Sequence, residues 1–263
     1  MQRRKFFQGS AVAAAAAVSG CASPGGPQQA PRTPFALPTT YIPVAGSGEV
    51  FPVRRIYCIG RNYRAHSIEM GSNPDREPPF FFQKPTDAIQ FVAAGSVPDH
   101  PYPPLTKNYH YEAELVAAIG KGGRNIPVAS ALEHVWGYSL GLDMTRRDLQ
   151  LAAREKSRPW DLGKDVEDSS VVSEIVPMTD TVLDKGALAL NVNGKVRQKS
   201  DLCKLIWSIP ELIADLSKFY HLQPGDLIFT GTPEGVGPLL PGDLVEGRVD
   251  GVGTIALTVG AAE

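Results

Sequence analysis

Two glutamates, Glu112 and Glu114, stand two residues apart in an otherwise apolar run that continues to Ile119. In a β-strand, residues i and i+2 point to the same face, so the two carboxylates would project side by side. Asp143 ends a second apolar run, which begins at Val135. Like charges held this close need a cation between them, or one must be protonated. Three carboxylates without a soft ligand nearby indicate Mg²⁺ or Mn²⁺, although a surface strand with a solvated acidic face would show the same pattern.

His66 and Glu69 form a second pattern that could carry chemistry. If this segment is helical, the two side chains lie at i and i+3 on one face. A carboxylate bonded to one imidazole nitrogen orients the ring and raises its basicity, which leaves the other nitrogen to activate water. An ordinary short helix with an exposed His and Glu is the simpler interpretation, and this pattern alone favours it.

Arg147 follows Asp143 by a few residues, and helix geometry would return it to the side of that carboxylate. Its guanidinium could bind a substrate carboxylate or pair with Asp143.

Lys164 lies in a loop-like stretch after a proline, where a lysine is usually solvated. Composition alone therefore does not single out Lys164.

The elements that would position these residues are mostly short strands. We expect strands over 54–59, 89–93, 111–119, 134–142, 187–192, 195–199, 226–230, 243–249 and 253–259. Asn193-Gly194 predicts a two-residue hairpin turn. Helices are expected over 62–69, over 144–155 with Thr145 as the cap, and over 209–220 with Pro210 in the first turn. Strands and helices do not alternate regularly, so we predict a strand-rich α+β domain rather than a parallel doubly wound sheet.

Length and composition set limits on the partners. The 263 residues suffice for one substantial core, with 43% hydrophobic and 21% charged residues. A formal net charge of −2 gives no reason to expect nucleic acid or an anionic membrane as a partner. Beyond the first two dozen residues, no apolar run is long enough to span a bilayer.

The first residues have the features of an export signal. A twin-arginine pair, Arg3-Arg4, precedes a short run of small apolar residues, and a lipobox-like sequence ends at Cys21. We predict an export signal over 1–21, a disordered tether rich in Pro, Gly, Gln and Ser over 22–40, and a catalytic domain over 41–263. The protein would then be periplasmic or anchored to a membrane by lipid on Cys21. A cytoplasmic extension is the alternative.

Two further cysteines, Cys58 and Cys203, lie in or beside apolar runs, so both are expected to be small buried residues. An oxidising compartment would permit a disulfide between them, but sequence does not establish that they are close.

Five ordered motifs together resemble the fumarylacetoacetate hydrolase family, and within it the branch of fumarylpyruvate and acylpyruvate hydrolases. The resemblance runs from about Arg54 to the C-terminus. The motifs occupy residues 60–70, 79–85, 111–115, 141–148 and 229–233.

The resemblance implies a mixed β-roll fold, a homodimer and one Mg²⁺ or Mn²⁺ per site. The metal ligands would be Glu112, Glu114 and Asp143. The water-activating pair would be His66 and Glu69, and Lys164 would be the active-site lysine. The positions that match substrate contacts are Arg147, Gln150 and Thr232, with Lys84 beside the site. In one departure from the family pattern, charged residues follow Lys164 where the family usually has an aromatic.

The resemblance implies hydrolysis of a carbon–carbon bond in a 2,4-diketo acid, which gives pyruvate and a second carboxylic acid. The same site could instead decarboxylate oxaloacetate, or hydrate or isomerise a related keto acid. A second class is an exported lipoprotein that binds keto acids without catalysis. A water-activating pair opposes this class, because a binding protein needs no base.

Overall fold

The computed structural model describes residues 33–73, 75–179 and 181–262, and residues from Thr39 onward cluster into one compact unit. The predicted export signal, the lipidation site at Cys21 and most of the predicted tether lie outside the described residues. They stay predictions.

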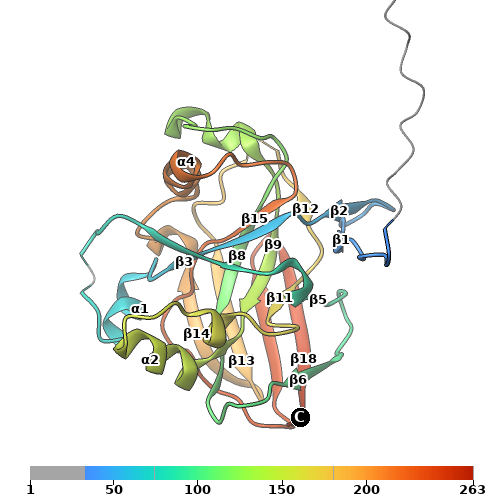
Figure 1. The fold of residues 1–263 in the computed structure, drawn as a ribbon, viewed down its shortest axis with the longest axis vertical. Helices are drawn as coiled ribbons and strands as arrows, with labels where there is room; N and C mark the ends of the chain where they lie inside the picture. The colour runs from blue at the N-terminus through green and yellow to red at the C-terminus, as the bar shows by residue number, and fades with distance from the viewer. Residues whose placement is uncertain (1–32, 74, 180, 263) are drawn as a thin grey trace, which may run out of the picture. The chain divides into compact units, whose positions relative to one another are not determined.

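The larger sheet of this unit is mixed, which confirms the strand-rich α+β class (Figure 1). Strand β3 pairs in parallel with β15, and β11 pairs in parallel with β5, while the remaining neighbours are antiparallel. In spatial order the sheet contains β4 (Phe80–Lys84), β3 (Arg55–Gly60), β15 (Asp226–Phe229), β8 (Ala113–Ile119), β9 (Val135–Asp143), β11 (Ser170–Val172) and β5 (Ile89–Phe91), with β12 (Val176–Pro177) also on β9.

A second sheet packs against the first across the main core. It contains, in order, β14 (Lys195–Asp201), β13 (Ala187–Val192), β17 (Leu244–Val249), β18 (Gly253–Ala262) and β6 (Asp99–Tyr102). Leu140 and Leu142 of β9 and Leu188 and Leu190 of β13 are fully buried in one cluster. A side chain on Gly247 of β17 would contact both leucines of β9, so the two sheets approach closely there.

Two small sheets complete the strands of the described residues. One pairs β1 (Tyr41–Pro43) with β2 (Val50–Pro52), and the other orders β10 (Thr145–Arg146), β7 (Tyr109–Tyr111) and β16 (Gly237–Pro238). The predicted hairpin turn is confirmed. Asn193 and Gly194 have φ angles of 52° and 71° between β13 and β14, as a type I′ turn requires.

Helices are few, as predicted. They are α1 (Arg64–Glu69), α2 (Arg147–Glu155), α3 (Asp161–Lys164) and α4 (Ile209–Phe219), with 3₁₀ turns η1 (Thr86–Ala88), η2 (Val128–His134) and η3 (Leu202–Lys204). In α4 the side chain of Glu211 accepts a hydrogen bond from the Ser208 backbone at 2.9 Å, and Pro210 lies in the first turn.

The prediction for the helix over 144–155 was wrong at its start. Thr145 belongs to strand β10, where it pairs with His110, and its hydroxyl donates to the Asp143 carbonyl at 3.1 Å. Because strand pairing fixes Thr145 in an extended backbone, it cannot cap the helix, which begins at Arg147.

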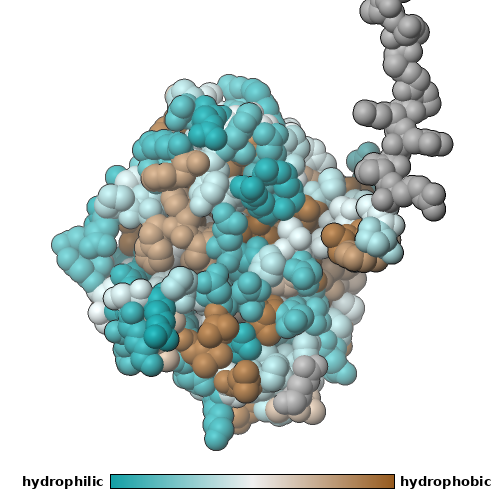
Figure 2. All heavy atoms as spheres, viewed as in Figure 1, coloured by the Kyte–Doolittle hydropathy of each residue, from teal (hydrophilic) through white to brown (hydrophobic). Residues whose placement is uncertain are grey.

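The cysteine prediction was partly wrong. Cys58 is buried in β3, but Cys203 is exposed, and both are free thiols. No disulfide joins them. On the face in Figure 2, hydrophilic residues surround scattered hydrophobic ones. None of the helices in the described residues has the length and apolar composition that crossing a membrane requires.

Candidate active site

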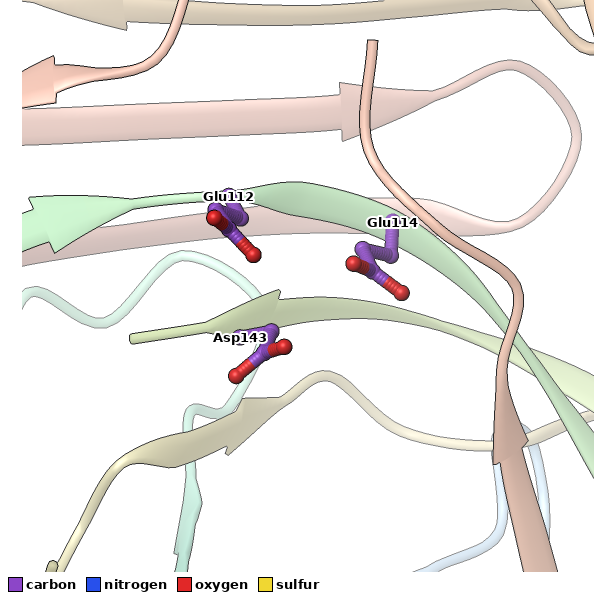
Figure 3. Close-up of side chains that lie close together, drawn as sticks. All are labelled: Glu112, Glu114 and Asp143. Atoms are coloured by element: carbon purple, nitrogen blue, oxygen red, sulfur yellow. The ribbon is translucent and has the colours of Figure 1, made fainter. Parts of the chain in front are cut away.

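Three buried carboxylates gather where two neighbouring strands of the larger sheet meet (Figure 3). Glu112 immediately precedes β8, Glu114 is the second residue of that strand, and Asp143 is the last residue of β9. The backbone N–H of Asp143 donates to the Glu112 carbonyl at 2.8 Å, which fixes the two residues side by side. One oxygen from each carboxylate lies within 4.8 Å of the others, so the three could hold a single metal ion.

Of the three carboxylates, Glu114 is the one that forms no ion pair among the described residues. Burial and the neighbouring carboxylates of Asp143 and Glu112 raise the pKa of Glu114 well above its ordinary value. A hydrogen bond from the Gly231 backbone N–H, at 2.7 Å, opposes this shift only in part. A hard divalent ion among the three oxygens would remove the repulsion, so the donor set fits Mg²⁺ or Mn²⁺.

Two lysines surround the carboxylates. Lys164, in the short helix α3, is buried rather than solvated, and its Nζ lies 2.7 Å from Glu112 Oε2 and 2.6 Å from Asp143 Oδ2. Burial would lower the pKa of Lys164, but the Asp143 and Glu112 carboxylates raise it overall, so the side chain is a cation. Lys84 approaches Asp143 Oδ1 at 2.7 Å.

Lys84 is not on the wall of the pocket that a substrate would enter. Its other two protons go to the carbonyl oxygens of Met144, at 3.0 Å, and Ser169, at 2.7 Å. All three donors of the ammonium group are therefore used. The structure places Lys84 beside the site and behind Asp143, as a positioning residue.

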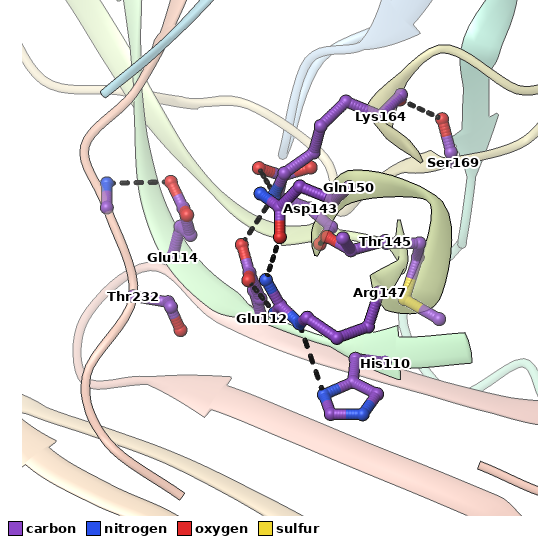
Figure 4. Close-up of polar contacts among 12 residues, drawn as sticks. His110, Glu112, Glu114, Asp143, Thr145, Arg147, Gln150, Lys164, Ser169 and Thr232 are labelled. Atoms are coloured by element: carbon purple, nitrogen blue, oxygen red, sulfur yellow. Dashed lines mark hydrogen bonds and ion pairs between the residues drawn. The ribbon is translucent and has the colours of Figure 1, made fainter. Parts of the chain in front are cut away.

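Arg147 pairs with Glu112, and the predicted alternative of a pair with Asp143 was wrong (Figure 4). The prediction assumed one helix through both residues, whereas Asp143 ends a strand. The guanidinium also donates to Gln150 Oε1, and its Nε lies 3.5 Å from His110 Nδ1. Burial and the Arg147 charge lower the pKa of His110 to about 4, so this imidazole is neutral and accepts from Arg147.

His66 and Glu69 lie on one face of α1, as predicted. His66 Nδ1 is 3.0 Å from Glu69 Oε2, and Glu69 Oε1 accepts from the Gly235 backbone N–H at 2.9 Å. Burial opposes ionisation of Glu69, but the bonds from His66 and Gly235 lower its pKa overall. The carboxylate therefore accepts the Nδ1 proton of His66, which leaves Nε2 free to act as a base.

These groups converge on one pocket with an empty volume of about 470 Å³, including the part open to solvent. The predicted site residues on its wall are His66, Glu112, Glu114, Arg147, Gln150, Lys164 and Thr232. The Thr232 hydroxyl already donates to the Ala113 carbonyl at 2.9 Å and accepts from Gln198 at 2.8 Å. Thr232 therefore has one remaining lone pair for a substrate.

Charged and aromatic residues that sequence reasoning missed also lie on this wall, namely Arg61, Phe82, Arg154 and Trp160. Arg61 lies inside the motif at 60–70, directly after a predicted strand, and this position could have marked it as a site residue. Arg154 gave none, because a charged residue near the end of a helix is usually solvated. In the structure, hydrogen bonding to Met70 and Ser72, just after α1, holds it at the pocket.

Asp165 and Glu167, which follow Lys164, lie outside this pocket. Asp165 and Glu167 are exposed, while Val166 between them is buried. Neither acid lies on the pocket wall. The charges gained at Asp165 and Glu167 are therefore not added to the lining of the pocket.

Comparison with known proteins identifies the family. The model of the fumarylacetoacetate (FAA) hydrolase C-terminal domain matches residues 55–260. The chain belongs to the fumarylacetoacetate hydrolase family. The match covers every strand that carries a carboxylate of the cluster, and it confirms the resemblance found in the motifs.

Relatives within the fumarylacetoacetate hydrolase family carry several activities. A fumarylpyruvate hydrolase from Ralstonia sp. is 56% identical over 196 residues, which is 74% of this chain and 100% of the relative. The structure of Pseudomonas aeruginosa fumarylpyruvate hydrolase in complex with Mn²⁺ and pyruvate has a TM-score of 0.86 and 51% identity, and the match covers 88% of this chain and 100% of that one. The mouse mitochondrial oxaloacetate tautomerase FAHD1 is 42% identical over 212 residues, or 80% of this chain and 93% of the relative.

Proposed function

We propose that this chain is a metal-dependent hydrolase of acylpyruvates and that its substrate is fumarylpyruvate. The products are fumarate and pyruvate. The observation that carries the proposal is the position of His66. Its ring is oriented by Glu69 and opens on the same pocket as the carboxylates of Glu112 and Glu114. The relatives from Ralstonia sp. and Pseudomonas aeruginosa support this choice of substrate.

Glu112, Glu114 and Asp143 would hold one Mg²⁺ or Mn²⁺. Bound there, the ion supplies Lewis acidity to the carboxylate and 2-keto oxygens of a keto acid. The Pseudomonas aeruginosa relative contains Mn²⁺, which supports Mn²⁺ as one of the ions used.

The charge of the pocket favours an anionic substrate. The three carboxylates already face three cations, Lys84, Lys164 and Arg147. A divalent ion would leave the cluster with a net positive charge, and a substrate with two carboxylates offsets that charge.

His66 acts as the general base. Its Nε2 takes a proton from water while the water oxygen bonds to C4 of the diketo acid, the carbonyl carbon of the acyl group. The bond between C3 and C4 then breaks, and its electron pair stays on C3. His66 returns the proton to C3, which completes pyruvate, and the acyl carbon leaves as the carboxyl group of fumarate.

Lys164 stabilises the negative charge that spreads from C3 to the 2-keto oxygen during cleavage. Its ammonium group is fixed by Glu112 and Asp143 before substrate binds, so little reorganisation is needed at the transition state. Arg147 and Gln150 are held by each other and present polar groups to the substrate from α2.

Decarboxylation or tautomerisation of oxaloacetate is the alternative, and the mouse relative supports tautomerisation. Both reactions place negative charge on a keto acid in the same way, but neither adds water to a carbonyl carbon. The ordered pair of His66 and Glu69 supports hydrolysis, which needs a base to activate water. Tautomerisation also uses a base, at C3, so the choice of hydrolysis over tautomerisation rests on the fumarylpyruvate hydrolase relatives.

The deciding experiment follows the diketo chromophore of fumarylpyruvate with protein purified from Thr39 onward. We expect metal-dependent loss of absorbance with Mg²⁺ or Mn²⁺, one pyruvate per substrate consumed, and no loss with a chelator. Oxaloacetate is tested in parallel. Turnover of oxaloacetate alone would replace hydrolysis with decarboxylation or tautomerisation, and metal binding without any turnover would favour a keto-acid binding protein.

Export and assembly belong to the same proposal. Arg3-Arg4, the small apolar run and Cys21 support export and a lipid anchor. The family resemblance supports a homodimer, which sedimentation of the purified protein tests. Replacement of Arg3 and Arg4 by lysine should keep the protein in the cytoplasm, and Cys21→Ala should release it from the membrane fraction. Unchanged fractionation of both variants would contradict export and anchoring.

A further inference from the structure

We propose that Arg61 and Arg154 form a subsite for the second carboxylate of a dianionic keto acid. This inference deepens the proposed function, since it explains why a fumaryl group would be preferred over an uncharged acyl group. It rests on two guanidinium groups that reach the pocket from segments far apart in the sequence.

Arg61 is held at the pocket wall by its backbone and by an aromatic ring. It directly follows β3 with a φ of 59°, a left-handed conformation that is uncommon for a residue with a side chain. Its guanidinium carbon lies 5.4 Å from the centre of the Phe80 ring. Phe80 in turn packs edge-on against Trp160, at 5.5 Å between ring centres. The charged group is thus oriented without a carboxylate partner.

Arg154 reaches the pocket from the last turn of α2, which lies beside α1 (Figure 1). Its Nη1 donates to the Met70 carbonyl at 3.0 Å, and its Nη2 lies 3.5 Å from the Ser72 hydroxyl. These bonds use neutral acceptors. They orient the guanidinium and leave its positive charge uncompensated.

The two positive charges are close enough to repel. Burial and the charge of Arg154 both lower the pKa of Arg61, and the Glu77 carboxylate opposes this shift only in part. Across the residues that the structure describes, neither arginine forms an ion pair, although Arg147 and Lys164 of the same pocket are both paired with carboxylates. Two adjacent, oriented and unpaired guanidinium groups form a site for an anion, and a carboxylate matches their planar geometry.

Other residues of the pocket wall fit the uncharged carbon atoms that would join the two charged ends of such a substrate. The apolar side chains of Ile59, Met70 and Leu151 line the same pocket. They suit the uncharged carbons of a fumaryl group, while the keto-acid end occupies the carboxylate cluster. A substrate of this class therefore has one charged end at each set of polar groups.

The test compares two substrates on the same variants, Arg61→Gln and Arg154→Gln. Binding of fumarylpyruvate and of acetylpyruvate, which lacks the second carboxylate, is measured by calorimetry with Mn²⁺-loaded protein that also carries His66→Ala, so that the substrates are not consumed. Turnover is measured separately with His66 intact. Each variant should weaken fumarylpyruvate binding about 10- to 100-fold, the usual range for a lost charge-assisted hydrogen bond, and change acetylpyruvate binding less than about threefold. Arg158→Gln is the matched control. It removes the same charge, and Arg158 is exposed and lies outside this pocket.

The outcomes separate a carboxylate subsite from a purely structural role of the two arginines. Equal weakening of both substrates would overturn the subsite, since that result would mean that Arg154 only braces α1 or that Arg61 only supports β3. A wild-type protein without preference for fumarylpyruvate would also overturn it. Selective binding that depends on the two arginines supports the subsite even if no turnover occurs. Absence of turnover would then count against the hydrolase function alone.

Discussion

The ammonium nitrogen of Lys164 lies 2.6 Å from Oδ2 of Asp143, so a fixed cation and a candidate metal ligand share one buried contact. A metal ion at Asp143 would lie near this charge and be repelled by it. The position of Lys164 is therefore unfavourable for metal affinity and favourable for stabilising negative charge on a substrate.

Lys164→Met should separate these two effects. We expect turnover of fumarylpyruvate to fall at least about 100-fold, because a preorganised charge at the developing anion is lost. Affinity for Mn²⁺ should stay the same or rise, because the repulsion is removed. Calorimetry with Mn²⁺ and a spectrophotometric assay measure both quantities. A loss of metal affinity that matches the loss of turnover would show that Lys164 only shapes the ligands.

His66→Ala should abolish turnover without removing the metal. We expect kcat to fall about 100- to 10,000-fold, the usual contribution of a general base, with Mn²⁺ affinity changed by less than about threefold. Glu69→Gln should reduce kcat less, because an amide still accepts the Nδ1 proton but carries no charge. Equal loss of metal binding and turnover in His66→Ala would contradict its role as the base.

Glu114→Gln should weaken metal binding and yet not destabilise the metal-free protein. The carboxylate is buried beside Asp143 and Glu112, whose charges raise its pKa, so removing the charge relieves repulsion. The amide oxygen can still accept from the Gly231 N–H. We expect at least about a tenfold loss of Mn²⁺ affinity and an unfolding free energy in chelator that is unchanged or higher.

Glu112→Gln is the matched control for that result. Glu112 pairs with both Arg147 and Lys164, and these two cations lower its pKa against the effect of burial. Its replacement should lower the unfolding free energy by about 3 kcal/mol or more, because two buried cations lose a partner. Urea unfolding in chelator compares the two variants. Similar stabilities would show that the charges of the cluster are not arranged as described.

His100 should make the protein less stable in mild acid. Burial lowers the pKa of His100 to about 4, against 6.5 for the ordinary side chain, and its ring bonds to Gln90 at 2.7 Å and Tyr109 at 2.9 Å. The unfolded chain therefore binds a proton more readily than the folded one below pH 6.5. The contribution of neutral His100 to the unfolding free energy is fully present above pH 6.5, and it is lost progressively as the pH falls toward 4.

The expected loss from His100 alone is about 2 kcal/mol between pH 7 and pH 5. Urea unfolding at both values measures it. In His100→Gln the drop should be smaller by that amount, while acid-sensitive groups elsewhere contribute equally to both proteins. An identical pH dependence of the two proteins would mean that His100 is accessible to protons in the folded state.

Local patterns in the sequence were sufficient for the features that depend on neighbouring residues. The two-residue spacing of Glu112 and Glu114 placed both carboxylates on one face, and the three-residue spacing of His66 and Glu69 brought them within 3.0 Å. The hairpin at Asn193-Gly194 followed from the backbone conformations these residues adopt readily. Each depends on geometry within a few residues, which the chain specifies directly.

Contacts between distant segments were decided only by the tertiary structure. Strand register, not helix geometry, placed Asp143 beside Glu112 and left Arg147 to pair with Glu112 instead. Lys164 is buried because two carboxylates from other strands compensate its charge, and no local pattern encodes that compensation. Arg61 and Arg154 also line one pocket only through the tertiary structure. Arg154 is held there by its bond to the Met70 carbonyl, a contact that is set by the whole chain rather than by the residues around either arginine.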